Sequence, residues 1–541
     1  MMSRHQMLTL ILLSCLALAR GFVGVNPTEP FNYSTEVDTN GNYLLFWKFN
    51  DTHITFEVHV KTYGYVAFGL SDNGKMYPAD LVVGWVKDGV THFKDYHTTA
   101  HAAPAVDKHQ DWFLLHGEEN DFGTVLKFVR NLDTCDKIED KTIEDGTIRM
   151  IYAYHPKDPA TDDSVMYHGP DHRGTKSLSL LSVSSAASVT SSSENQDVQI
   201  YDFLNGNFII PSAATTYNCR VFRMPNIGGK RHMIKKHVHH ILVHRCRGID
   251  PKFDNSNYMC YDDIPKGLVP CYDVIIAWAI GGTTFYYPNH VGYSVGAPDD
   301  PDVYILETHY DNPAQTSGMI DNSGIRITLT KHLRPYEADM MEIGHDVNWT
   351  HIIPPFEKAY VSQSHCASQC IDHTLGNITE IKVFGIFQHA HLIGRNPHYD
   401  FDFQETRLLR KEIAVRRGDS LMVECLYDSS HRTQATMGGL STRDEMCLSF
   451  IIYYPKVALK QCVSSPTFDS ISNDQNRLFP LLSTYNWTTQ HNRDQFKQKL
   501  KESSIIHVCQ GDTMVPETVT YTFHENPPVH SYVPPKSSTC P

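Results

Sequence analysis

A strand-like run in the last third of the chain ends in two histidines that could bind one metal ion. Residues Ile381–Phe387 are mostly apolar or β-branched, which predicts a strand. The run continues into Gln388-His389-Ala390-His391. Residues two apart on a strand share one face, so His389 and His391 can present both imidazoles to the same ion. Such a pair is also common in proteins without a metal, so the prediction requires ligands elsewhere in the chain.

A second group of histidines stands in another strand-like run, which ends at Cys246. His239 and His240 are adjacent, and adjacent residues on a regular strand point to opposite faces. They can share one ion only where the backbone departs from that geometry. His237 and His239, which are two apart, form the alternative pair, and the residues themselves leave this choice open.

His309 and Met446 complete the candidate set. His309 lies in the run Glu307–Pro313, and Met446 stands beside Cys447. Imidazole with thioether is a soft ligand set that suits Cu(I), whereas a structural zinc site would use thiolates or carboxylates. A zinc hydrolase is disfavoured because the chain has no His-Glu-x-x-His motif. The residue types therefore predict copper.

In this order, the motifs resemble those of the copper type II, ascorbate-dependent monooxygenases, the group of dopamine β-hydroxylase and peptidylglycine α-hydroxylating monooxygenase. Val238-His239-His240 with Glu307–Pro313 is similar to the first copper site of that family. Gln388–Arg395 with Glu445-Met446-Cys447 is similar to its second. The resemblance covers almost the whole mature chain.

The resemblance implies an enzyme with two coppers per chain and with ascorbate as the electron donor. A substrate C–H bond would become C–OH at the expense of O2. The implied ligands are His239, His240 and His309 for the electron-transfer copper, and His389, His391 and Met446, the catalytic set, for the copper that activates O2. The alternative is a secreted protein that binds copper, haem or sugar without turnover.

The front of the chain, residues 31–175, predicts an all-β sandwich of short antiparallel strands. The strand-like runs include Tyr43–Phe49, Ile54–Val60, Leu81–Val86 and Ile148–Tyr154. Gly64–Ser71, followed by Met76 and Ala79–Trp85, resembles the DOMON domain, a family that binds haem or sugars in some members. This front places the chain with dopamine β-hydroxylase and the DBH-like monooxygenases. A Met–His haem pair would need Met76 and His155, and we favour a loop methionine and a strand-end histidine instead.

The rest of the chain predicts two further β-bodies. A serine-rich linker is expected at residues 176–197. Two antiparallel, jelly-roll-like copper domains follow at 198–350 and 351–525, with one helix near Arg493–Glu502, and an extended proline-rich tail occupies 526–541. The fold class is therefore all-β throughout.

The N-terminus and the cysteines predict export. Residues 1–20 read as a signal peptide, because the apolar run Met7–Ala19 is too short to span a bilayer. A soluble secreted or lumenal product is expected, with membrane attachment only if this segment is retained. Five Asn-x-Ser/Thr sequons agree with this route: Asn32, Asn50, Asn348, Asn377 and Asn486.

Twelve of the thirteen cysteines remain after removal of Cys15 with the signal peptide, as expected for six disulfides. The residues alone leave the connectivity open. The family resemblance implies the pairs Cys135–Cys540, Cys219–Cys260, Cys246–Cys271, Cys366–Cys462, Cys370–Cys509 and Cys425–Cys447.

Charge and composition restrict the partners. The net charge of −14 without a long basic run argues against nucleic-acid binding. The expected partners are O2, ascorbate and a small substrate such as a phenylethylamine, and a homodimer is left open. An ammonium substrate would need a carboxylate near the second copper, for which Glu357, Asp400 and Glu405 are candidates that the sequence cannot rank.

Overall fold

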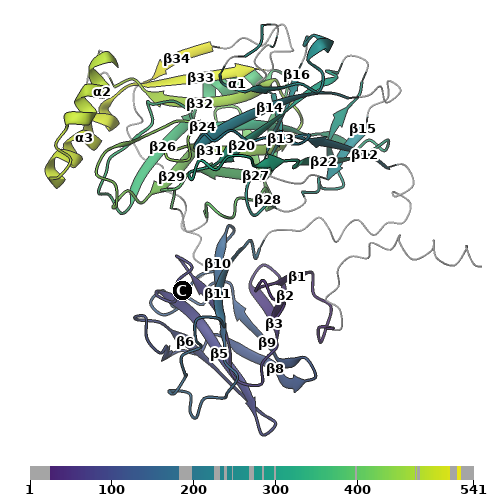
Figure 1. The fold of residues 1–541 in the computed structure, drawn as a ribbon, viewed down its shortest axis with the longest axis vertical. Coiled ribbons are helices and arrows are strands. Elements are labelled where there is room, and N and C mark those ends of the chain that lie inside the picture. The colour runs from purple at the N-terminus through teal and green to yellow at the C-terminus, as the bar shows by residue number, and fades with distance from the viewer. Residues whose placement is uncertain are drawn as a thin grey trace, which may run out of the picture. The chain divides into compact units, whose positions relative to one another are not determined.

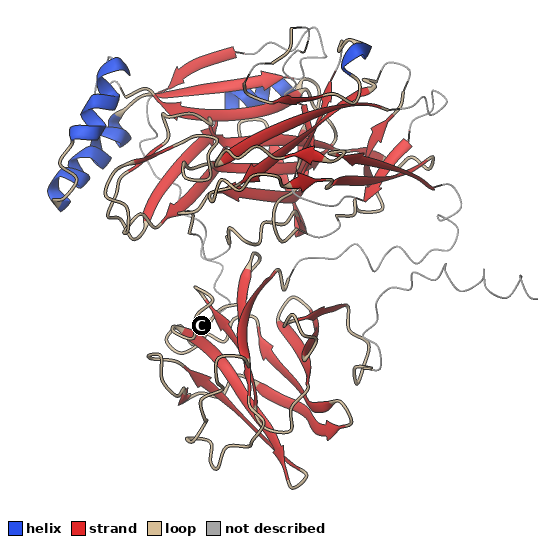
Figure 2. Ribbon diagram, viewed as in Figure 1, coloured by secondary structure: helices blue, strands red, loops and turns tan. Residues whose placement is uncertain are grey.

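The computed structural model describes residues 25–181, 198–224, 232–236, 241–246, 248–262, 264–266, 268, 273–282, 285–297, 300–395, 399–468, 471, 475–511 and 521–525. The predicted signal peptide, the tail at 526–541, most of the serine-rich linker and His237–His240 lie outside these residues. Strands dominate both compact units, one containing residues 25–144 and 149–176 and the other 145–148 and 177–525 (Figure 2). The all-β prediction is confirmed.

The first unit has two antiparallel sheets (Figure 1). One has the order β1-β2-β3-β9-β8: Tyr33–Glu36, Tyr43–Phe49, His53–Val60, Gly123–Asn131 and Phe113–Asn120. The other has the order β11-β10-β4-β5-β6-β7: Arg173–Leu178, Ile148–Tyr154, Val66–Ser71, Ala79–Lys87, Val90–His97 and Ala105–Val106. β2 and β10 have the bounds that the sequence predicts. The facing aromatic rings of Phe56, Phe68 and Phe128 lie 4.8–5.8 Å apart in the core between the sheets.

The second unit begins with a first half, residues 198–338, built on two five-stranded sheets and one two-stranded sheet. One sheet has the order β12-β22-β15-β19-β23: Val198–Leu204, Gly324–Thr330, His232–Lys236, Val291–Val295 and Tyr336–Glu337. The other has the order β17-β14-β20-β16-β18: Asn257–Met259, Thr215–Arg223, Val303–Asp311, Leu242–Cys246 and Asp273–Ala277. Phe208–Ile209 (β13) pairs with Ile320–Asp321 (β21).

The second half, residues 339–525, is organised by a seven-stranded sheet. Its order is β28-β27-β31-β24-β32-β33-β34: Arg407–Arg416, Glu380–Ala390, Cys447–Tyr454, Asp339–His345, Leu459–Pro466, Ile505–Gly511 and Tyr521–Glu525. Two small sheets pair Ile352–Ile353 (β25) with Thr436–Met437 (β30), and Tyr360–Cys366 (β26) with Leu421–Tyr427 (β29). β24 lies between β31 and β32, although the sequence prediction assigns its residues to the first copper domain.

In its described residues the second half has three α-helices: Ser368–Leu375 (α1), Gln475–Thr484 (α2) and Gln490–Glu502 (α3). The helix expected near Arg493–Glu502 is therefore present, and it begins three residues earlier, where the Thr489 side chain accepts a hydrogen bond from the Asn492 N–H. α1 and α2 are not among the predicted elements. No helix in the described part of the chain is long and apolar enough to cross a membrane.

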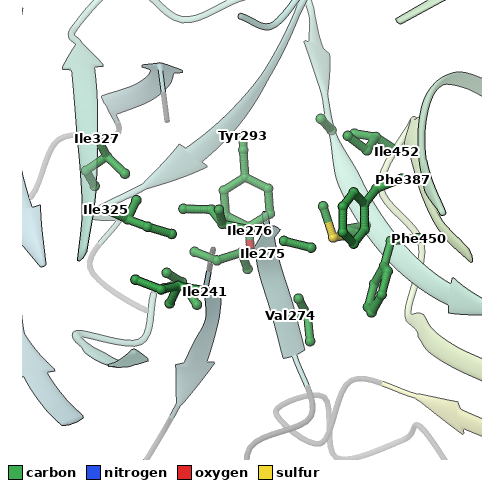
Figure 3. Close-up of a cluster of buried hydrophobic side chains, with 14 of the residues drawn as sticks. Ile241, Val274, Ile275, Ile276, Tyr293, Ile325, Ile327, Phe387, Phe450 and Ile452 are labelled. Atoms are coloured by element: carbon green, nitrogen blue, oxygen red, sulfur yellow. The ribbon is translucent and has the colours of Figure 1, made fainter. Parts of the chain in front are cut away.

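The two halves of the second unit share one hydrophobic core (Figure 3). Ile276 and Tyr293 from the first half and Phe387 and Phe450 from the second belong to the same buried cluster. Because large apolar side chains from both halves exclude water together, the halves are held directly against each other rather than by the connecting chain alone.

A buried ion network crosses the same seam. Lys460 Nζ of the second half lies 2.9 Å from Asp273 Oδ1 of the first half and 2.5 Å from Asp339 Oδ2. Arg245 lies 2.8 Å from the other oxygen of Asp273. All four side chains are at most 5% exposed, so each charge depends on its protein partners for compensation.

Four disulfides join described residues: Cys219–Cys260, Cys366–Cys462, Cys370–Cys509 and Cys425–Cys447. They are four of the six pairs that the family resemblance implies. Cys135 and Cys246 are also disulfide-bonded, and Cys540 and Cys271, their expected partners, lie outside the described residues.

Candidate metal centre

The two histidines of the opening motif lie at the end of β27. His389 is the penultimate residue of the strand, and His391 is the first residue after the strand ends at Ala390. Their ring centroids are 5.2 Å apart, with the ring planes nearly perpendicular. The alternation of the strand thus places both imidazoles in one neighbourhood, as the spacing predicts.

The protein engages the Nδ1 atom of each ring. His389 Nδ1 lies 2.7 Å from Gln404 Oε1, whose amide is oriented by a hydrogen bond from its Nε2 to Phe401 O. His391 Nδ1 lies 3.1 Å from the carbonyl oxygen of Asp444. Because both oxygens can only accept, each Nδ1 carries the hydrogen and each Nε2 keeps its lone pair.

His391 Nε2 is buried and has no hydrogen-bond partner in the part of the chain that the structure describes. Burial, followed by the nearby His389, lowers the pKa of His391 to about 3. The ring is therefore neutral near pH 7 and leaves a buried acceptor without a donor, which suits a metal ligand.

Glu445 fixes the position of the histidine segment relative to Met446. Its carboxylate accepts the backbone N–H groups of His391 (2.8 Å) and Ile393 (2.7 Å). Met446 follows it in the chain, and the Tyr427 hydroxyl donates to the Met446 carbonyl at 2.6 Å. The next residue is held by the Cys425–Cys447 disulfide. These contacts thereby hold the backbone of Met446 next to the histidine segment.

His309 of the first half reaches the same place. Its ring centroid lies 6.4 Å from that of His391, and it stacks on Tyr217 at 4.3 Å. Burial, then the neighbouring His389, lowers the pKa of His309 to about 4. The other two histidines expected with it, His239 and His240, and the alternative His237, fall outside the described residues. The structure thus brings four of the six predicted ligands together.

A cavity of about 460 Å³ lies on the seam beside these residues. His309, His389 and Met446 line it, with aromatic walls that include Tyr258 and Phe450. The cavity therefore lies between the two halves, in a seam that is otherwise packed.

One part of the cavity wall is polar. Glu307 accepts a hydrogen bond from the Tyr261 hydroxyl at 2.9 Å and lies 3.1 Å from His244 Nε2. Glu342, from the second half, accepts from Gln461 Nε2 at 3.2 Å. Burial raises the pKa of Glu342 to about 7. Two carboxylates therefore face a largely apolar space whose wall includes several aromatic rings.

The carboxylates considered from the sequence lie elsewhere. Glu357 bonds to Arg493 and Lys497 at 3.2 and 3.0 Å, and neither Asp400 nor Glu405 lines the cavity. Glu307 could have been found, since it lies two residues before His309 on the same strand face. Gln404 and Glu342 could not, because only the fold brings them to the site.

In the first unit, Met76 and His155 are the two residues that a Met–His haem pair would need. Met76 lines a cavity of about 810 Å³ in that unit. His155 does not line it and stacks instead on Tyr65, with ring centroids 5.7 Å apart. Of the sequons, Asn32, Asn50, Asn377 and Asn486 are exposed, while Asn348 is half-buried and its Nδ2 donates to Asp346.

Three family models match the chain: DOMON domain at residues 39–155, copper type II ascorbate-dependent monooxygenase N-terminal domain at 201–317, and the C-terminal domain of that family at 336–397 and 392–475. DBH-like monooxygenase protein 1 of Mus musculus is 38% identical over 487 residues, which cover 84% of this chain and 78% of that protein. The protein of the same name from Homo sapiens is 39% identical over 468 residues, covering 81% and 75%. Dopamine beta-hydroxylase of Rattus norvegicus is 32% identical over 490 residues, covering 84% and 78%.

The donor set fits the metal in the family name. Neutral imidazoles and a thioether suit copper in both of its common oxidation states, and the buried Nε2 of His391 has no other partner among the described residues. A DOMON domain followed by two copper domains agrees with the observed all-β order. The chain belongs to the copper type II ascorbate-dependent monooxygenase family, and it is a monooxygenase that uses copper, O2 and ascorbate.

Proposed function

We propose that this enzyme holds two copper ions per chain and hydroxylates a C–H bond of a small, phenylethylamine-like substrate. The proposed ligands are His239, His240 and His309 for the electron-transfer copper, and His389, His391 and Met446 for the copper that activates O2. The observation that carries the second set is the pair of Nδ1 hydrogen bonds, to Gln404 and to Asp444, which leaves both Nε2 atoms free to bind metal.

Copper at this site supplies the reduction of O2, with electrons from ascorbate, and the transfer of one oxygen atom to carbon. The protein keeps the ligand atoms ready for it. Gln404 and the Asp444 carbonyl set the tautomers of His389 and His391, and Glu445 holds the backbone between the histidines and Met446. A thioether favours the reduced metal, which is the state that reacts with O2.

Glu342 is our candidate for recognising a substrate ammonium group. Glu307 is already bonded to Tyr261 and close to His244, whereas the partner of Glu342 is the neutral amide of Gln461. A carboxylate in a largely apolar cavity with aromatic rings in its wall favours a cationic, aromatic molecule, because charge pairing is strong away from water and ring stacking adds to it.

We further propose that the protein works in the secretory pathway, either secreted or in a vesicle or endoplasmic reticulum lumen. The disulfides and the exposed sequons support this route. The domain boundaries, the glycosylation of the five sequons and the two disulfides with partners outside the described residues remain proposals of the same kind. A homodimer and membrane attachment through a retained leader are subsidiary hypotheses.

The test is ascorbate-driven O2 consumption by the copper-loaded enzyme, with a panel of phenylethylamines and analysis of the products. Wild type is expected to bind two coppers and to couple O2 uptake to a hydroxylated amine. Met446→Ala should bind the second copper more weakly and lose the coupled product, while Met422→Ala, which does not line the cavity, should behave as wild type. A single copper per chain would refute the two-copper proposal, and coupled turnover only on neutral substrates would refute the ammonium assignment.

A further inference from the structure

Two buried histidines that the copper chemistry does not use stand near the segment that contains Met446. His345 is the last residue of β24, and His351 directly precedes β25. Their rings are stacked, with centroids 4.2 Å apart and an angle of 12° between the ring planes. The Nε2 atoms of both rings contact the hydroxyl of Ser362 on β26, at 2.8 and 3.1 Å. We call His345 and His351 the histidine pair.

The described surroundings of the histidine pair offer no counter-charge for a protonated ring. The two side chains are 7% and 3% exposed, and they line a cavity of about 700 Å³ whose wall includes residues of β26 and α3. The carboxylates in this wall, Glu357 and Asp494, both pair with Lys497 of α3, at 3.0 and 2.8 Å. Asp346, which follows His345, accepts a hydrogen bond from Asn348 Nδ2. The other titratable groups around the pair are Tyr360, His365, Tyr427, Lys501 and His507.

Protonation would add a charge and a donor that this site does not accommodate. With both rings neutral, the Ser362 hydroxyl can donate to one Nε2 and accept from the other. A protonated His351 would also carry a hydrogen on Nδ1, and that atom is buried with no hydrogen-bond partner in the described part of the chain. Burial lowers the pKa of His345 to about 4, and burial, then the nearby His345, lowers the pKa of His351 well below its usual range. The pair is therefore neutral at pH 7, and its contribution to stability is lost as the pH falls below about 6.5.

Backbone contacts join the histidine pair to residues 436–446, which we call the ligand segment because they end at Met446. β25 follows His351 directly and pairs with β30, the first two residues of the ligand segment. The Gly438 N–H donates to the His351 carbonyl at 2.6 Å. The backbones are so close here that a Cβ on Gly438 would lie 2.3 Å from the carbonyl oxygen of Asn348. The Glu445 N–H donates to the carbonyl of Met437, so the two ends of the ligand segment are bonded to each other.

A second connection runs through Tyr427. Its ring centroid lies 5.6 Å from that of His351, and its hydroxyl donates to the Met446 carbonyl at 2.6 Å. We propose that His345 and His351 are positioning residues for the ligand segment, and that they hold it in place only while both rings are neutral. This role rests on the proposed function, in which Met446 binds copper. In an acidic compartment the thioether would be held less firmly, so the second site would retain copper less well.

The test is hydrogen–deuterium exchange of the ligand segment, measured by mass spectrometry on the full-length, copper-free protein at pH 7 and pH 5. After correction for the intrinsic pH dependence of exchange, the protection of residues 436–446 in wild type is expected to fall at least tenfold, because a released histidine with a pKa of about 6.5 takes up a proton over this range. The double variant His345→Gln/His351→Gln has amides that can bond to Ser362 but cannot be protonated, so its protection should change by less than about threefold. No copper is required, so a failure here leaves the two-copper proposal to its own test.

His431→Gln, at an exposed position in the same half, is the matched control and should keep the pH dependence of wild type. The buried rings of His309, His389 and His391 are common to all these proteins, so the difference from wild type reports the histidine pair. If the double variant does not fold by circular dichroism, His351→Gln alone decides and should reduce the change between pH 7 and pH 5 at least threefold. The proposal is overturned if the protection in wild type does not depend on pH, or if the double variant keeps the wild-type dependence. Protection lost equally at both pH values in the double variant would show a merely structural role and would also overturn it.

Discussion

Two places along the seam of the second unit bury ionisable side chains in opposite ways. At Lys460 the charges are matched, because this one ammonium lies between Asp273 of the first half and Asp339 of the second, and Arg245 covers the far side of Asp273. At the cavity the groups face open space, with His309, His389 and Met446 in the wall together with Glu342. The charged groups around Lys460 pair with one another. At the cavity, by contrast, ionisable and metal-binding side chains line a space that a ligand can fill.

The difference shows how one interface can contain both a stabilising ion network and a candidate reaction site. Burial tends to raise the pKa of Asp273, and Lys460 and Arg245 outweigh it, so this carboxylate stays ionised and paired. Among the described residues no arginine or lysine lines the cavity, where burial raises the pKa of Glu342, and burial lowers the pKa of the neighbouring His391. Paired charges therefore hold the two halves together at the ion network, where we expect no chemistry. At the cavity the proposed ligand imidazoles are neutral, which suits copper binding.

The largest expected effect is on activity. His391→Ala removes a proposed copper ligand and should lower turnover by about a thousandfold, which corresponds to about 4 kcal/mol in the activation barrier. The free energy of unfolding should fall by no more than about 2 kcal/mol. Steady-state kinetics and denaturant unfolding measure the two effects. His431→Ala, at an exposed position in the same half, is the control. If His391→Ala lost stability but kept turnover, His391 would be a structural residue, and our assignment of the cavity as the reaction site would be wrong.

The complementary change is at the ion network. Lys460→Met leaves two buried carboxylates without their shared cation and should destabilise the protein by about 3–5 kcal/mol. The fraction that remains folded should keep its turnover within about threefold. Lys358→Met, at an exposed lysine, should change the free energy of unfolding by less than about 0.5 kcal/mol. Equal stability of the two variants would show that the network does not hold the seam.

A smaller effect is expected for a residue that hydrogen-bonds to a proposed copper ligand but does not itself bind the metal. Gln404→Leu removes the acceptor that sets the tautomer of His389 and should weaken copper binding at the second site by about 10- to 100-fold, as measured by copper titration. Gln498→Leu on the exposed face of α3 should leave the affinity unchanged. Unchanged copper affinity in Gln404→Leu would mean that Glu445 and the backbone position the histidines without this contact.

The smallest effect concerns pH and substrate. Glu342 has a pKa of about 7, raised by burial, so its charged form gains as the pH rises. The KM for a phenylethylamine should therefore fall by about tenfold between pH 6 and pH 8. Glu342→Gln should raise KM and remove this dependence, whereas Glu424→Gln, at an exposed glutamate, should not. A pH profile that survives in Glu342→Gln would place ammonium recognition elsewhere.

Much of this arrangement follows from local sequence. The strands that carry the site are short runs of apolar and β-branched residues, and β2 and β10 have the bounds that their patterns predict. The spacing of His389 and His391 predicts a shared neighbourhood because a strand repeats every two residues. The helix α3 could also be anticipated, whereas α1 is only eight residues long and is anchored through Cys370, a contact that no local pattern contains.

What the sequence by itself determined is therefore the all-β class, the candidate ligands and their chemistry, since residue type and short-range spacing carry that information. Only the tertiary structure decided which distant groups meet them. Gln404 reaches His389, and Glu342 joins His244 and Glu307 at one cavity, because strands far apart in the chain pack across the seam. Three aspartates of the first unit, Asp80, Asp95 and Asp140, come together for the same reason, because the pairing of β5 with β6 and the segment after β9 bury them close to one another. Burial and long-range contact depend on the whole fold, so they cannot be read from any one stretch of the chain.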